Sequence, residues 1–140
     1  MTTPSWGELQ VGASPEPRSY GPVTRTDIVR YVGASGDFNP IHHDEEFARR
    51  AGFPTVFSPG LYQAGVLAGF ATDWLGPTNV RRISLQFRTQ VWPGDVLVCT
   101  AQVTARDESA DGRTVDIDLR ATVASSGEPA VVASATFVVA

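Results

Sequence analysis

The stretch from Gly60 to Trp74, which reads GLYQAGVLAGFATDW, constrains the fold of this chain more than any other. Its apolar residues recur at helical spacing, and Asp73 is its one charged residue. A helix that is apolar on nearly all sides is usually buried on most of them, so other elements must cover it. Its frequent Gly and Ala residues would allow a sheet to approach the helix backbone closely. Gly76 and Pro77 end the helical pattern.

The second half of the chain predicts the sheet that provides this cover. After residue 78 come four stretches rich in Val, Ile, Thr and Phe, and apolar and polar residues alternate in several of them. Short turn sequences separate the last three, so these strands should run antiparallel. The predicted strands cover residues 80–91, 96–106, 114–125 and 130–139.

Shorter elements precede the apolar helix. The pattern predicts a strand around Arg18–Val23 and then a helix that begins after Thr24, with Asp27 three residues on, as in a capped N-terminus. Gly33 and Gly36 should end this helix. A further helix is predicted over Asp44–Ala51, since acids open it and arginines close it. Helices followed by strands predict an α+β fold, with a long antiparallel sheet wrapped around one central helix.

Composition predicts one globular domain over residues 1–140. Hydrophobic residues make up 42% of the chain and charged residues 19%, which is ordinary for a globular protein. The formal net charge of −4 argues against a nucleic-acid partner, and no apolar run approaches the ~18 residues of a membrane span. The first 20 residues lack signal-peptide features, so we expect a cytoplasmic protein. Cys99 is the one cysteine and is expected to be a small buried side chain.

The segment Ser35–Asp44 carries the candidate chemistry. Asp37 and His42 are five residues apart across Asn39-Pro40, where proline disfavours a helix and indicates an irregular turn. Such a turn can direct a carboxylate and an imidazole into one cavity, where they could hold a water and exchange protons with it. The same residues could instead satisfy buried polar groups in an ordinary turn. His42, His43 and Asp44 also suggest a metal, but no third and fourth ligand is evident.

Two further features bear on a site. Gly60, at the predicted helix start, exposes backbone N–H groups that could bind an oxygen gaining negative charge, although it could equally permit close packing. Arg81, Arg82 and Arg88 could meet phosphates, but solvated strand charges are the simpler interpretation. Phe87 is expected to pack in the core or in an interface.

These motifs resemble a known family. The D-x-N-P-[IL]-H motif is complete from Asp37 to His42, and Ala51-Gly52-Phe53, the Gly-led apolar helix and the turn Val91–Asp95 accompany it. Together they are similar to the MaoC-like, hotdog-fold (R)-specific enoyl-CoA hydratases, also called hydratase 2 proteins or acyl dehydratases. The resemblance extends from about Trp6 to the end of the chain.

The resemblance implies a reaction and a set of roles. Asp37 would take a proton from water, His42 would hold that water and assist proton delivery, Gly60 would polarise the thioester carbonyl through its N–H, and Asn39 would orient the loop. The substrate would be an acyl-CoA or acyl-carrier thioester, with no metal or redox cofactor. A homodimer is expected, and nucleic acid and membrane are not expected partners. A subunit active only beside another hotdog chain, or a thioesterase-like or non-catalytic binder, are the alternatives.

Two positions depart from the family pattern. Pro59 stands where most members have a histidine before the glycine, and its fixed φ could still pre-shape the helix start. Ala68 replaces a small polar residue that some relatives carry in the helix. We expect these differences to affect the substrate and the rate and to leave the Asp37–His42 pair intact.

Overall fold

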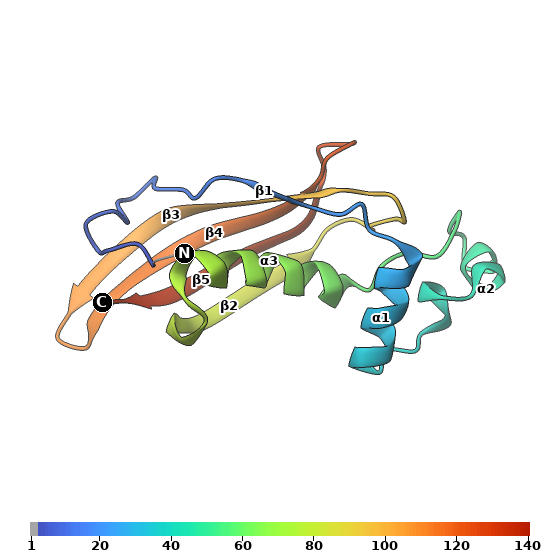
Figure 1. Cartoon of the computed structure of the whole chain (residues 1–140), viewed down its shortest axis with the longest axis horizontal. Helices are drawn as coiled ribbons and strands as arrows, with labels where there is room; N and C mark the ends of the chain where they lie inside the picture. The colour runs from blue at the N-terminus through green and yellow to red at the C-terminus, as the bar shows by residue number, and fades with distance from the viewer. Residues whose placement is uncertain (1–2) are drawn as a thin grey trace.

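The computed structural model describes residues 3–140, which form one antiparallel sheet and a few helices (Figure 1). Among these residues the strand order in the sheet is β1-β3-β4-β5-β2, and every neighbouring pair is antiparallel. The elements are β1 (Arg18–Tyr20), α1 (Arg25–Ser35), the 3-10 turn η1 (Pro40–His42), α2 (Glu45–Arg50), α3 (Gly60–Leu75), the 3-10 turn η2 (Pro77–Asn79), β2 (Val80–Phe87), β3 (Leu97–Ser109), β4 (Gly112–Val123) and β5 (Pro129–Val139).

Helix α3 lies along one face of the sheet and contacts β2, β3, β4 and β5 (Figure 1). Leu67 and Phe70 of α3 are at most 2% exposed, and they belong to the same buried cluster as Leu119 and Phe137 of the sheet. Full burial of each such side chain stabilises the fold by about 1.5–3 kcal/mol before entropy is counted. The predicted α+β fold with one central helix is confirmed.

The outer side of α3 is less covered than its sequence predicts. Leu61 is 60% exposed, and Gly65 and Gly69, one and two turns further on, are exposed as well. These residues are spaced four apart, so they share one face of the helix. The prediction of burial on most sides is therefore wrong for this face, because the sheet can cover only the side that it packs against.

The strand at the edge of the sheet is shorter than predicted. β2 ends at Phe87, whereas the alternating pattern continues to Val91. The N–H of Arg88 still donates to the carbonyl of Ala130, but the partner strand β5 begins at Pro129, so the pairing ends there. Further along, the carbonyl of Val91 accepts a hydrogen bond from the N–H of Ser58, outside the sheet, at 2.9 Å. The Asp95 carboxylate then accepts from the N–H of Trp92 and closes the following turn. Residues 88–96 are thus a loop, and it passes close to the start of α3.

Strand β1 and helix α1 also differ at their ends from the prediction. β1 stops at Tyr20, since Gly21 has φ +117° and Val23 donates its N–H to Asp95 instead of to the ladder. Helix α1 continues through Gly33 and ends at Gly36, whose φ is +75°. A glycine in this left-handed conformation is the usual end of a helix.

Helices α1 and α2 lie beyond one end of the sheet, with α1 near the first turn of α3 and α2 further out (Figure 1). Thr24 and Asp27 form the expected capping box of α1, and Asp44 caps α2 by accepting from the N–H of Phe47. Arg25 of α1 joins the two helices through an ion pair of 2.9 Å with Glu45. The loop between α1 and α2, which carries the candidate residues, is therefore held at both ends.

No helix among residues 3–140 is long and apolar enough to cross a membrane. Cys99 on β3 is buried, as predicted, and burial raises the pKa of its thiol to about 12. A thiol in this state stays protonated at neutral pH and packs as a small apolar group.

Candidate active site

The loop between α1 and α2 is shaped by its own side chains. Asn39 caps η1, since its Oδ1 accepts from the N–H of Ile41 at 3.1 Å and its carbonyl accepts from the N–H of His42. Oδ1 of Asp37 accepts from the N–H of Asn39 at 3.4 Å. The prediction of an irregular turn is close, but the chain makes one short 3-10 turn at Pro40–His42.

This turn brings Asp37 and His42 together. Oδ2 of Asp37 lies 3.7 Å from Nε2 of His42. The His42 side chain is 9% exposed and the Asp37 side chain 45%, so the pair joins a buried imidazole to a solvent-accessible carboxylate. A separation of 3.7 Å is too long for a direct hydrogen bond and suits two groups that share a small polar molecule.

The other imidazole nitrogen of His42 has a defined partner. Nδ1 lies 2.7 Å from the carbonyl oxygen of Phe57, and the Phe57 ring packs edge-on against the imidazole at 5.4 Å between centroids. A carbonyl oxygen can only accept, so Nδ1 must carry the proton. In the neutral ring Nε2 is then unprotonated and faces Asp37.

Asp37 lies at the rim of a groove of about 430 Å³. His42 contacts two of the residues in its wall, Asp37 and Phe57. The wall is formed by the loop after α1, the start of α3 and the loop after β2, which are distant in sequence. The lining residues are Asp37, Phe57, Ser58, Gly60, Leu61, Gln63, Phe87, Arg88, Thr89 and Gln90.

Gly60 is both the first residue of α3 and part of this wall. Pro59, the preceding residue, gives the helix no side-chain cap, and the N–H groups of a first helical turn have no partner within the helix. A Cβ added at Gly60 would lie 2.9 Å from two atoms of the Phe87 ring. Glycine therefore lets the helix start approach Phe87 and keeps its backbone accessible from the groove.

Several wall residues were not found from the sequence. Phe87 was expected in the core or in an interface; it is 52% exposed and borders the groove, so it lies outside the core of this chain. Ser58, just before the apolar helix, and Gln63, within it, had no sequence signal beyond being polar. Arg88, which was assigned to solvent, is exposed and also lies at the rim. Asn39 is not part of the wall and contacts only the loop.

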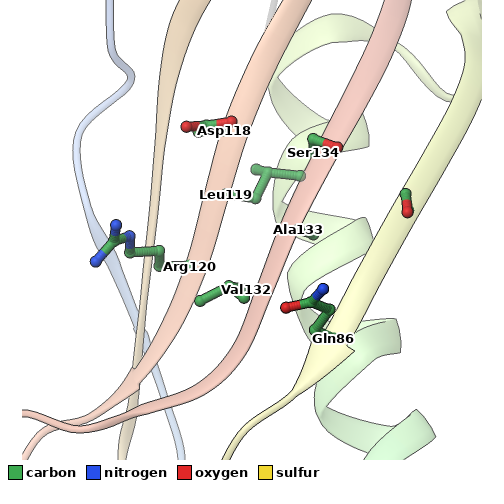
Figure 2. Close-up of a pocket in the computed structure, with 8 residues that line it drawn as sticks. Gln86, Asp118, Leu119, Arg120, Val132, Ala133 and Ser134 are labelled. Atoms are coloured by element: carbon green, nitrogen blue, oxygen red, sulfur yellow. The ribbon is translucent and has the colours of Figure 1, made fainter.

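A second hollow, of about 260 Å³, lies on the face of the sheet opposite α3 (Figure 2). Asp118 and Arg120 of β4, Gln86 of β2 and Ser134 of β5 project into it, with α3 visible behind the strands. Both histidines of the chain are in the loop after α1, so this hollow has no imidazole. Among residues 3–140, no group of three or more His, Cys, Asp or Glu side chains could hold a metal ion.

The protein is similar to solved and curated proteins of one kind. The (R)-hydratase from A. caviae involved in PHA biosynthesis superposes with a TM-score of 0.81 at 25% identity, over 94% of this chain and 98% of that one. The peroxisomal enoyl-CoA hydratase 2 of Arabidopsis thaliana is 42% identical over 67 residues, which are 46% of this chain and 22% of that protein. The 3-hydroxybutyryl-CoA dehydratase of Methylorubrum extorquens is 36% identical over 83 residues, 58% of this chain and 53% of that protein.

A single antiparallel sheet packed on one long helix, superposable on the A. caviae hydratase, defines a hotdog-fold protein. The model of the MaoC like domain family matches residues 8–125. The chain therefore belongs to the MaoC-like family, and the predicted resemblance is confirmed. The aligned segments span about a fifth and about a half of the length of the two curated relatives.

Proposed function

We propose that the protein is a hydro-lyase that adds water across the double bond of trans-2-enoyl thioesters to give (R)-3-hydroxyacyl thioesters, and catalyses the reverse dehydration. The observation that carries this proposal is the placement of Asp37 Oδ2 and His42 Nε2, 3.7 Å apart, at the rim of a groove that also includes Gly60. The names of the relatives, hydratases and dehydratases of CoA thioesters, support it.

In the proposed reaction Asp37 and His42 share one water molecule. Nε2 of His42 is unprotonated because Nδ1 donates to the carbonyl of Phe57. It accepts a hydrogen bond from one O–H of the water and so directs the water oxygen toward C3 of the enoyl thioester. Asp37 removes the other proton as the C3–O bond forms. The electrons of the C2–C3 double bond move toward the thioester carbonyl, and the pair then returns a proton to C2. One water is added, and no electrons are gained or lost.

The developing charge on the thioester oxygen needs a donor. We assign this role to the backbone N–H of Gly60, which stands at the positive end of the α3 dipole and in the same groove as Asp37. Asn39 supports the loop by capping η1. The proposed route uses no metal or redox cofactor, because the thioester itself acidifies the hydrogens on C2.

The proposed partners follow from the same assignment. The substrate is an acyl-CoA or acyl-carrier thioester, and residues 1–140 act as one MaoC-like domain in the cytoplasm. A homodimer is favoured by β2, which pairs with β5 on one side only among the described strands, and by the exposed Leu61 and Phe87 nearby. Dependence on a different hotdog chain is the alternative.

The direct test is hydration of crotonyl-CoA by the purified protein. We expect the absorbance of the conjugated enoyl thioester to fall, with (R)-3-hydroxybutyryl-CoA as the product on chiral analysis. Release of free thiol without hydration would instead identify a thioesterase. If the protein alone shows no turnover of crotonyl-CoA or longer enoyl-CoA substrates, the proposed self-sufficient hydratase is wrong. A mass measurement in solution then decides between a homodimer and a monomer that needs a different hotdog chain for activity.

A further inference from the structure

Two polar side chains beside the groove are almost completely buried. Ser58 is 1% exposed and Gln63 is 2% exposed. The Ser58 hydroxyl donates to Oε1 of Gln63 at 2.8 Å. Burying polar groups is unfavourable unless they are hydrogen-bonded, and apolar side chains fill most interior positions. A buried hydroxyl–amide pair next to a candidate active site therefore points to a specific role.

Ser58 also belongs to the peptide group that contacts His42. The N–H of Ser58 donates to the carbonyl of Val91 at 2.9 Å. The carbonyl of Phe57, in the same planar peptide group, accepts from Nδ1 of His42 at 2.7 Å. A rotation of this one peptide would disturb both contacts. The Gln63 side chain, from the first turn of α3, restrains Ser58 from a third direction.

We propose that Gln63 is a positioning residue that acts through Ser58. By holding the Ser58 side chain, it keeps the Phe57 carbonyl on Nδ1 of His42 and so selects the tautomer in which Nε2 is unprotonated and faces Asp37. The kinetic consequence of this inference rests on the proposed hydration. The tautomer itself does not, and it can be measured without any substrate.

The tautomer is accessible to NMR because the chain has two histidines, His42 and His43. In ¹⁵N-labelled protein at a pH where a histidine of ordinary pKa (~6.5) is neutral, His43→Gln removes the second set of signals. We expect Nδ1 of His42 to carry the proton in the parent protein. Gln63→Met and Ser58→Ala should each shift the nitrogen signals toward a mixture of the two tautomers.

The same variants should lower the rate if the protein is a hydratase. We expect kcat to fall about tenfold with KM nearly unchanged, since the groove remains and only the alignment of the imidazole is lost. The double variant Ser58→Ala/Gln63→Met should be no slower than the slower single variant, because both substitutions break the same hydrogen bond between Ser58 and Gln63. Gln102→Met, an amide on β3 remote from the groove, and Val103→Ala, a destabilising core change, should leave kcat and the His42 signals unchanged.

The outcomes separate the two proposals. A tautomer shift in Gln63→Met or Ser58→Ala without any hydration by the parent protein would support the positioning role and overturn the function. Hydration by the parent protein, with folded variants whose His42 signals and kcat are unchanged, would overturn the positioning role alone. If Gln63→Met does not fold, Ser58→Ala and the parent spectrum decide, and a parent His42 protonated on Nε2 overturns the inference.

Discussion

The groove beside Gly60 and the hollow on the opposite face of the sheet both contain an aspartate, yet they differ in what surrounds it. Asp37 faces an imidazole that is 9% exposed and held by the Phe57 carbonyl, with a buried polar pair in the same wall. Asp118 stands among exposed side chains on a strand (Figure 2). Polar residues in a hollow do not make a reactive site; a partner fixed by buried contacts does.

The largest expected effect separates these two aspartates. Asp37→Asn should lower the rate of crotonyl-CoA hydration by about 10²–10⁴-fold, because the amide cannot accept the proton from water. The melting temperature should change little, since the Asp37 side chain is 45% exposed. Asp118→Asn is the matched control and should keep the parent rate. If the parent protein, Asp37→Asn and Asp118→Asn hydrate crotonyl-CoA at equal rates, the groove is not the active site.

The two histidines give the next comparison. His42→Gln should reduce hydration by about 10²-fold, since the variant loses the ring nitrogen that holds the water. It should also lower stability, because the imidazole packs against the Phe57 ring. His43→Gln removes an exposed imidazole one residue away and should leave the rate unchanged. Steady-state hydration assays of His42→Gln and His43→Gln at several pH values test this prediction. Comparable losses of rate in both variants would contradict the assignment of His42 as the histidine that holds the water.

A smaller effect is expected at the start of α3. In Gly60→Ala the new methyl would lie 2.9 Å from the Phe87 ring, which is half exposed and can move aside. We expect roughly a tenfold loss in kcat/KM, from a partly blocked groove and a displaced N–H donor. Gly33→Ala in α1, where nothing lies within 4 Å of the added carbon, is the control. It should keep the rate and gain up to about 1 kcal/mol of stability.

The smallest effect concerns a third aspartate that serves structure only. Hydrogen bonds from the Thr24 side chain and then from its backbone N–H lower the pKa of Asp27. The ionised carboxylate therefore stabilises the fold above its unfolded-state pKa, and this contribution is lost as the pH falls through the lower folded-state value. In urea unfolding at pH 7 and pH 3, Asp27→Asn should lose less stability on acidification than the parent protein. An equal loss in both would show that the cap does not titrate.

Local signals predicted the elements that depend on neighbouring residues. The Thr24–Asp27 capping box and the apolar helix that starts at Gly60 were both found from the sequence. Asp37 and His42 could be paired in advance because six consecutive residues contain both and the proline between them limits the backbone. The family resemblance depended on the same short segments.

The sequence by itself determined the order of the elements, the class of fold and the carboxylate–imidazole pair, because each depends on residues close together in the chain. Only the tertiary structure decided that Phe57 fixes His42, that Ser58 and Gln63 are buried beside them, and that Phe87 borders the groove and lies outside the core. These contacts depend on how α3 packs against the sheet and where β2 ends. Packing of that kind is the sum of many weak long-range contacts, and no local pattern encodes it.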